Sequence, residues 1–78
     1  MKEYVYLIYY DRSRGTYDPK FQIHLSLRGA KNAVMQMMKE STEKYEDTWQ
    51  QIAKSSRFWQ WESDGGEYLS ITKMKVQE

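Results

Sequence analysis

Apolar and polar positions along the chain alternate with two different periods, one helical and one strand-like. Between residues 26 and 38 the apolar side chains recur at the i, i+3, i+4 spacing of a helix face. These residues are Leu27, Ala30, Val34, Met37 and Met38. Ser26 stands immediately before them, where an N-cap residue belongs. The spacing predicts an amphipathic helix over Ser26–Met38, with its apolar stripe against a core.

Two strand-like segments precede this helix. Glu3–Tyr10 is rich in β-branched and aromatic residues, and Phe21–Leu25 alternates apolar with polar positions. We expect the two segments to pair antiparallel. The segment between them, Asp11–Lys20, contains Gly15, Asp18 and Pro19 and is predicted to be a long loop.

A second helical spacing follows over Glu40–Ser56, where Tyr45, Trp49, Ile52 and Ala53 form a stripe. A single helix over both segments would be about 45 Å long, at 1.5 Å per residue. A seven-residue strand covers only about 23 Å. We therefore expect a break or bend near Ser41–Thr42, which would place the acidic residues Glu40, Glu43, Glu46 and Asp47 around the first turn of the second segment.

The end of the chain has the pattern of a β-hairpin. Arg57–Ser63 and Glu67–Val76 are strand-like, and Asp64, Gly65 and Gly66 between them predict a tight turn. The order strand, strand, helix, helix, strand, strand predicts an α+β two-layer sandwich. Its antiparallel sheet would have about four strands, with one or two helices on one face. Residues 1–78 would form a single domain.

This arrangement assigns the alternating residues to two faces of the sheet. The predicted core pairs the sheet residues Val5, Leu7, Phe21, Ile23, Trp59, Trp61, Leu69 and Ile71 with Leu27, Ala30, Val34, Met37, Trp49 and Ile52 of the helices. The opposite face would carry Tyr4, Tyr6, Ile8, Tyr10, His24, Phe58 and Tyr68. Three interpretations of this aromatic face remain open. In the first its tyrosines are only solvated, in the second they bind protein (including a second copy), and in the third they stack single-stranded nucleic acid beside Arg12, Arg14 and Lys20.

The composition limits the kinds of chemical site that the chain can form. The 78 residues include no Cys and one His, which excludes disulfides, thiolate metal sites and a histidine cluster. No nucleophile, phosphate-loop or paired-carboxylate pattern is present, so we expect no enzyme activity, cofactor or metal. Neither a signal peptide nor a membrane-spanning apolar run is visible, and we expect a cytoplasmic protein.

Three stretches of the chain resemble small proteins of bacteriophages and mobile elements. They are the opening KEYVYLIYY, the segment HLSLRGAKNAVMQMM and the closing FWQWESDGGEYLSITKMKV. Some proteins of this kind are anti-CRISPR or other anti-defence inhibitors. The resemblance implies a compact non-enzymatic viral protein that binds and occludes a host defence complex, such as a CRISPR effector, in the host cytoplasm.

The residues expected to contact such a protein or nucleoprotein partner combine the aromatic face with the long loop. They are Tyr4, Tyr6, Tyr10, Arg12, Arg14, Tyr17, Lys20, His24 and Tyr68. The alternatives are a single-stranded nucleic-acid (RNA) binding module that uses the same face, and a homodimer.

Overall fold

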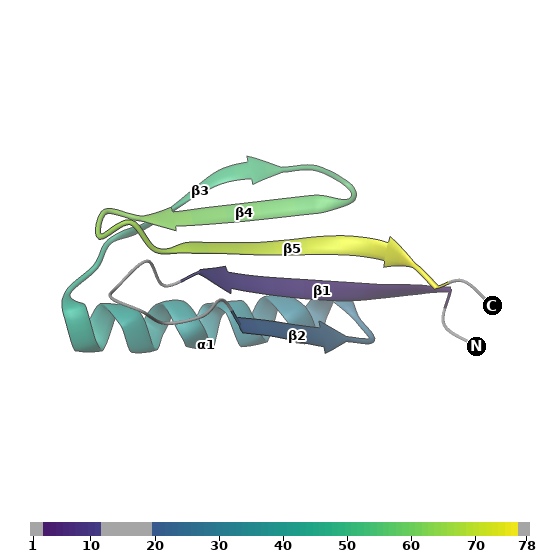
Figure 1. The fold of residues 1–78 in the computed structure, drawn as a ribbon, viewed down its shortest axis with the longest axis horizontal. Helices are drawn as coiled ribbons and strands as arrows, with labels where there is room; N and C mark the ends of the chain where they lie inside the picture. Colours follow the sequence, from purple (N-terminus) through teal and green to yellow (C-terminus); the bar gives the residue numbers. More distant parts are fainter. Residues whose placement is uncertain (1–2, 12–19, 77–78) are drawn as a thin grey trace.

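The structure, a computed structural model, describes residues 3–11 and 20–76. These residues form one helix and five strands, in an α+β fold (Figure 1). The elements are β1 (Tyr4–Asp11), β2 (Lys20–His24), α1 (Leu27–Tyr45), β3 (Trp49–Lys54), β4 (Phe58–Ser63) and β5 (Tyr68–Lys75). The strands form one sheet in the order β2-β1-β5-β4-β3, and all neighbours are antiparallel. The expected pairing of the first two strands is confirmed, and the sheet has one strand more than the sequence predicted.

The helix α1 covers one face of this sheet. It packs on β1 and on the two neighbours of β1, which are β2 and β5 (Figure 1). Ser26 is the N-cap as predicted, and its Oγ accepts a hydrogen bond from the Gly29 N–H at 3.1 Å. The helix is 19 residues long, about 28 Å, which matches the length of an eight-residue strand.

The prediction of a second helix over Glu40–Ser56 is wrong. α1 continues through Ser41–Thr42 without a break and ends at Tyr45, where Glu46 adopts a left-handed conformation (φ 60°). The Glu46 N–H donates to the Thr42 carbonyl at 2.9 Å and closes the last turn. The acidic residues around Glu46 therefore lie at the end of α1 rather than at a helix start.

The segment after α1 is a strand because it pairs with β4. Trp49 and Gln51 of β3 lie opposite Ser63 and Trp61 of β4, and the register then shifts between Gln51 and Ala53. Trp49 packs against the core from this strand. The shift leaves Ile52 47% exposed, so its predicted place in the core is also wrong.

The predicted assignment of residues to the two faces of β1 is inverted. Ile8 and Tyr10 are buried beneath α1, and Tyr6 packs against the same core. Their odd-numbered neighbours, Val5 and Leu7, lie on the other side of the sheet. The reason is the register with β5, in which the buried residues Ile71 and Leu69 lie opposite Ile8 and Tyr10.

The inversion extends to β2, because β2 pairs with β1. His24 and Gln22 lie opposite Tyr6 and Ile8 and share their face, so Phe21 and Ile23 lie away from the helix. The other core predictions are confirmed. Buried or packed against the core are Leu27, Ala30, Val34, Met37, Trp59, Trp61, Leu69 and Ile71.

A buried polar cluster connects the end of α1 to the β4–β5 turn. The side chain of Glu67 is fully buried and accepts hydrogen bonds from Ser41 Oγ (2.5 Å) and from the Tyr10 hydroxyl (3.2 Å). Ser41 Oγ also lies 2.9 Å from the buried Asp47 carboxylate. The turn itself is closed by Gly66, whose N–H donates to the Ser63 carbonyl and whose φ is 88°. This cluster fixes where the helix ends relative to the hairpin.

Candidate protein-binding face

The side of the sheet opposite α1, which we call the open face, is apolar over β2 and most of β1 and mixes apolar with polar residues over β5 and β4. The strand registers assign its residues, because side chains directly opposite each other point to the same side. Its apolar and aromatic members come from four neighbouring strands. They are Phe21 and Ile23 (β2), Val5, Leu7 and Tyr9 (β1), Tyr68, Thr72 and Met74 (β5), and Phe58 (β4).

Aromatic rings form one row across this face. The ring centroids of Phe21 and Tyr9, which lie directly opposite each other, are 5.1 Å apart. Tyr9 meets Tyr68 edge to face at 5.7 Å. Contacts of this geometry favour one arrangement of the rings. The row is therefore an ordered surface rather than a set of independently mobile side chains.

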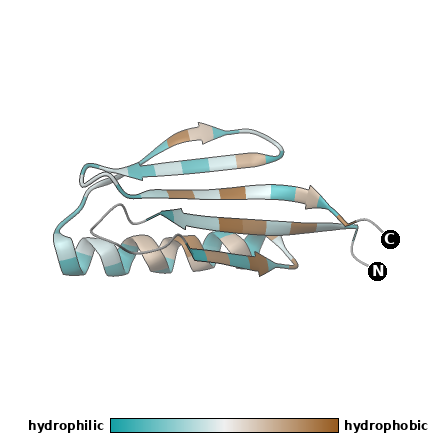
Figure 2. Ribbon diagram, viewed as in Figure 1, coloured by the Kyte–Doolittle hydropathy of each residue, from teal (hydrophilic) through white to brown (hydrophobic). Residues whose placement is uncertain are grey.

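A second, mainly aliphatic row runs parallel to the aromatic one. Ile23 lies opposite Leu7, Leu7 opposite Thr72, and Thr72 opposite Phe58. Val5 and Met74 extend the patch by one further pair. Figure 2 shows the apolar residues concentrated in β1, β2 and β5.

The outermost side chains of the patch are exposed to a degree unusual for large apolar residues. Phe21 is 61% exposed, Ile23 67% and Met74 45%. Four strands spaced about 4.8 Å apart and five residues rising about 3.3 Å each give a patch of roughly 300 Å² in projection. The largest apolar patch of a typical monomer has about this size, and such a patch is often functional.

The open face carries negatively charged side chains at one end. Asp11 and Glu62 lie beside Tyr68 in adjacent strands. The lysines of β5 lie on the helix side instead: Lys73 is opposite Tyr6, and its Nζ lies 4.3 Å from the centre of the Tyr4 ring. Among the described strand residues, the register thus gives the open face carboxylates but no lysine or arginine.

Tyr9, at the centre of this face, has a hydroxyl with a shifted pKa. Desolvation by its neighbours raises the pKa of the Tyr9 hydroxyl above the usual 10.0, and the adjacent negative charge of Asp11 adds to the effect. The hydroxyl also donates a long hydrogen bond of 3.4 Å to Asp11 Oδ2. Tyr9 is therefore a neutral, partly desolvated phenol at physiological pH.

Of the nine predicted contact residues, the structure places only Tyr68 on the open face. Tyr4, Tyr6, Tyr10 and His24 lie on the helix side, which corrects their prediction as an outward surface. Lys20, predicted in the loop, begins β2 and also lies on the helix side. Arg12, Arg14 and Tyr17 lie outside the described residues.

An apolar second face was predicted, but in β1 and β2 the residues assigned to it and those assigned to the core are exchanged. Phe21, Ile23, Val5 and Leu7 were assigned to the core and in fact form the open face. The signal that could have identified them lies in β5. Leu69 and Ile71 alternate there with polar residues and mark the core side, and pairing with β1 transfers that assignment to Tyr10 and Ile8.

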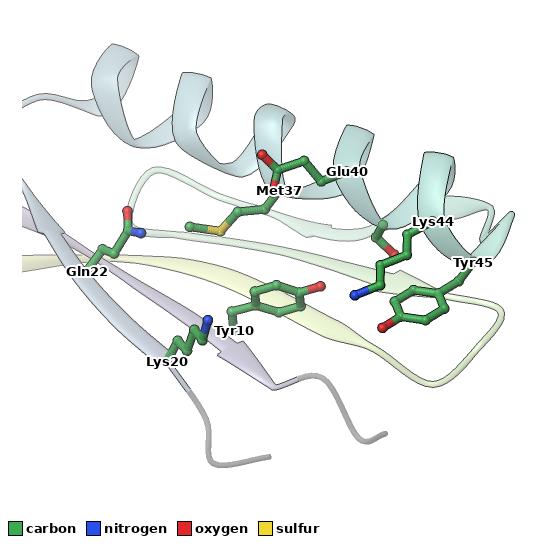
Figure 3. Close-up of a pocket in the computed structure, with 8 residues that line it drawn as sticks. Tyr10, Lys20, Gln22, Met37, Glu40, Lys44 and Tyr45 are labelled. Carbon is green, nitrogen blue, oxygen red and sulfur yellow. The ribbon is translucent and has the colours of Figure 1, made fainter. Parts of the chain in front are cut away.

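A cavity of about 280 Å³ lies on the helix side, between α1 and the edge of the sheet (Figure 3). Its described lining carries two ammonium groups, one carboxylate and two phenols. The residues are Tyr10, Lys20, Gln22, Met37, Glu40, Ser41, Lys44 and Tyr45. Lys44 Nζ lies 5.3 Å from the centre of the Tyr45 ring, so this charge is already engaged with an aromatic face. The described lining holds neither a His nor a Cys.

The described residues contain no group of three or more His, Cys, Asp or Glu side chains placed to hold a metal ion. In the same part of the chain, no helix combines the length and apolar character needed to cross a membrane. No protein-family model, curated protein or solved structure matches this chain.

Proposed function

We propose that the protein is a non-enzymatic binding protein that covers a surface of a larger partner protein with its open face. The observation that carries this proposal is the apolar part of the sheet face that no described helix or strand covers. Phe21, Ile23 and Met74 are each 45–67% exposed on it, although the opposite face of the same sheet is packed under α1. Burying side chains of this size contributes about 1.5–3 kcal/mol each.

The composition of the face favours protein over nucleic acid as the partner. Aromatic residues held by ring contacts, as Phe21, Tyr9 and Tyr68 are, resemble the anchors that dominate protein interfaces. A phosphate backbone requires cations, and the charged strand residues assigned to this face are Asp11 and Glu62. The partner surface that fits is apolar at its centre and basic where it meets these carboxylates.

The resemblance to small phage proteins supplies the class of partner. On that basis the partner is a host defence complex, such as a CRISPR effector in the host cytoplasm, and the protein inhibits it by occlusion. A chain of 78 residues with an apolar sheet face suits this role, because occlusion needs a contact surface rather than a catalytic group.

Two methionines provide a matched pair of variants to test the proposal. Met74 lies on the open face at 45% exposure, and Met35 lies on α1 at 63% exposure. Met74→Lys introduces a charge into the patch, whereas Met35→Lys makes the same change outside it. Wild type and both variants, each confirmed as folded, are immobilised and exposed to lysate of bacteria that carry CRISPR systems, and their inhibition of interference is measured in the same cells.

We expect wild type and Met35→Lys to retain a partner protein from the lysate. Met74→Lys should retain at least tenfold less of that protein, or none. Inhibition of interference should follow the same order. Equal retention and equal inhibition by both variants would exclude the open face. If the retained protein depends on the open face but belongs to no defence complex, the binding part of the proposal stands and the anti-defence role is excluded.

A further inference from the structure

We infer that two copies of this chain pair through their β2 edges, antiparallel and centred on Gln22, so that the two sheets become one. The inference concerns the strand edge rather than the open face, and it holds whether or not the open face binds another protein. Four observations on β2 and α1 support it.

The two edges of the sheet differ in how they are protected. β3 carries a register shift between Gln51 and Ala53, and irregularities of this kind discourage a further strand from pairing. β2 instead pairs with β1 in five consecutive regular positions, from Lys20 to His24, and contains no proline. Among the described residues β2 is an edge strand, and its outer edge therefore presents a regular row of backbone donors and acceptors.

The side chains of β2 are complementary to themselves in an antiparallel arrangement. With Gln22 opposite Gln22 of the second copy, Phe21 lies opposite Ile23 of the second copy on the open side. Pairs of an aromatic with a β-branched residue are favourable across antiparallel strands. On the helix side, Lys20 lies opposite His24 of the second copy. This register brings no two lysines of β2 face to face, and the chain's net charge of +1 opposes association weakly.

Exposure increases toward this edge. Phe21 and Ile23 are 61% and 67% exposed, whereas Tyr9 and Leu7, their partners in β1, are half-buried. Leu25, just beyond the end of β2, is also 63% exposed. The apolar patch thus ends at β2, where its side chains are most exposed, and a further strand paired with β2 would extend it. Pairing joins the open faces of the two copies into one surface.

The helices leave room for this arrangement. α1 contacts β1, β2 and β5, and it runs alongside β2 in Figure 1, which places the helix axis between β1 and β2. Across a β2–β2 seam two axes so placed are two to three strand spacings apart, about 10–14 Å. Packed helices need only about 8–10 Å between their axes, so the two α1 helices do not collide. The seam is short, and we expect an association with a micromolar dissociation constant.

Two exposed glutamines on the helix side of the two edge strands provide the test. Gln22→Lys places two lysines opposite each other at the centre of the seam, and Gln51→Lys makes the same change on β3. Sedimentation velocity of the full chain at about 10–500 µM should show a dimer for wild type and for Gln51→Lys. Gln22→Lys should stay monomeric throughout, or dimerise at least tenfold more weakly.

A second measurement uses the absence of cysteine from the chain. Directly opposed residues in antiparallel strands have Cα atoms about 4.5–5.5 Å apart, which is within the range of a disulfide. Gln22→Cys should therefore form a covalent dimer under mild oxidation, and Gln51→Cys should not. This readout does not depend on how Gln22→Lys folds.

Three results would overturn the inference. The first is a wild-type monomer at 500 µM together with no cross-link for Gln22→Cys. The second is a dimer that Gln22→Lys leaves intact. The third is a dimer that is lost with Met74→Lys but kept with Gln22→Lys, which would mean that the copies stack through their open faces.

Discussion

Ile8 of β1 lies directly opposite Ile71 of β5, and neither side chain has any exposed surface. The pair forms the floor of the core, with Ala30 and Val34 of α1 buried in the same cluster. Because side chains alternate along a strand, this one pairing also decides what lies on the other side. Leu7, the neighbour of Ile8, must lie on the open face.

The first prediction compares these two neighbours. Ile8→Ala removes fully buried methylenes beneath α1 and should lower the free energy of unfolding by about 2–5 kcal/mol. Leu7→Ala removes a half-buried side chain from the open face and should cost clearly less, about 1 kcal/mol. Urea unfolding of both variants measures the difference. A larger cost for Leu7→Ala would reverse the assignment of the two faces.

The faces of β1 could not be read from its own sequence. Val5, Leu7 and Tyr9 are as apolar as Tyr6 and Ile8, so either set fits a core, and a shift of one residue exchanges them. The alternation of apolar and polar residues in β5 is unambiguous. It assigns the faces of β1 only once the pairing of these two strands, about 60 residues apart in the chain, is known. Local pattern therefore predicted an apolar second face and its members Phe58 and Tyr68 correctly, and its members from β1 and β2 incorrectly.

The segment 49–54 shows a different ambiguity. Trp49, Ile52 and Ala53 fit a helical spacing, yet the short run also fits a strand, and periodicity alone does not separate the two. The distinguishing signal was the turn that follows. Ser55 Oγ accepts hydrogen bonds from the backbone N–H groups of Arg57 and Phe58, which makes residues 55–58 a hairpin turn rather than a helix end.

The second prediction concerns the hydroxyl of Ser41. It contacts the carboxylates of Glu67 and Asp47, and all three residues are buried. Ser41→Ala should lower the free energy of unfolding by about 1–3 kcal/mol, because buried oxygens lose a hydrogen-bond partner. The exposed Ser56→Ala is the control and should change stability by less than about 0.5 kcal/mol. Equal effects in chemical denaturation would show that the cluster is not stabilising.

The third prediction concerns the turn between β4 and β5. Gly66 has a φ of 88°, and a Cβ built there meets no atom within 4 Å. Gly66→Ala should therefore cost only the backbone strain, about 1–2 kcal/mol. Gly66→Asn should cost less, because asparagine tolerates this conformation better. Thermal unfolding of both variants measures the order, and a Gly66→Ala variant as stable as wild type would contradict it.

The fourth prediction follows from the raised pKa of Tyr9. Desolvation, and then the Asp11 charge, favour the neutral phenol in the folded protein, so the unfolded chain ionises first as the pH rises. Tyr9 therefore contributes stability that is complete below pH 10 and is lost as the pH rises through its folded pKa.

Subtracting the ultraviolet titration of Tyr9→Phe from that of wild type isolates this phenol among the seven tyrosines of the chain. Its midpoint should lie above pH 10, and Asp11→Asn should lower it, because the carboxylate that repels the phenolate is removed. The decline should remain incomplete, since desolvation is the larger cause. Loss of stability between pH 9 and 11 should also be shallower in Tyr9→Phe than in wild type. A midpoint at or below pH 10 would mean that the aromatic row does not shield the Tyr9 hydroxyl from water. It would therefore contradict the description of the open face as an ordered surface.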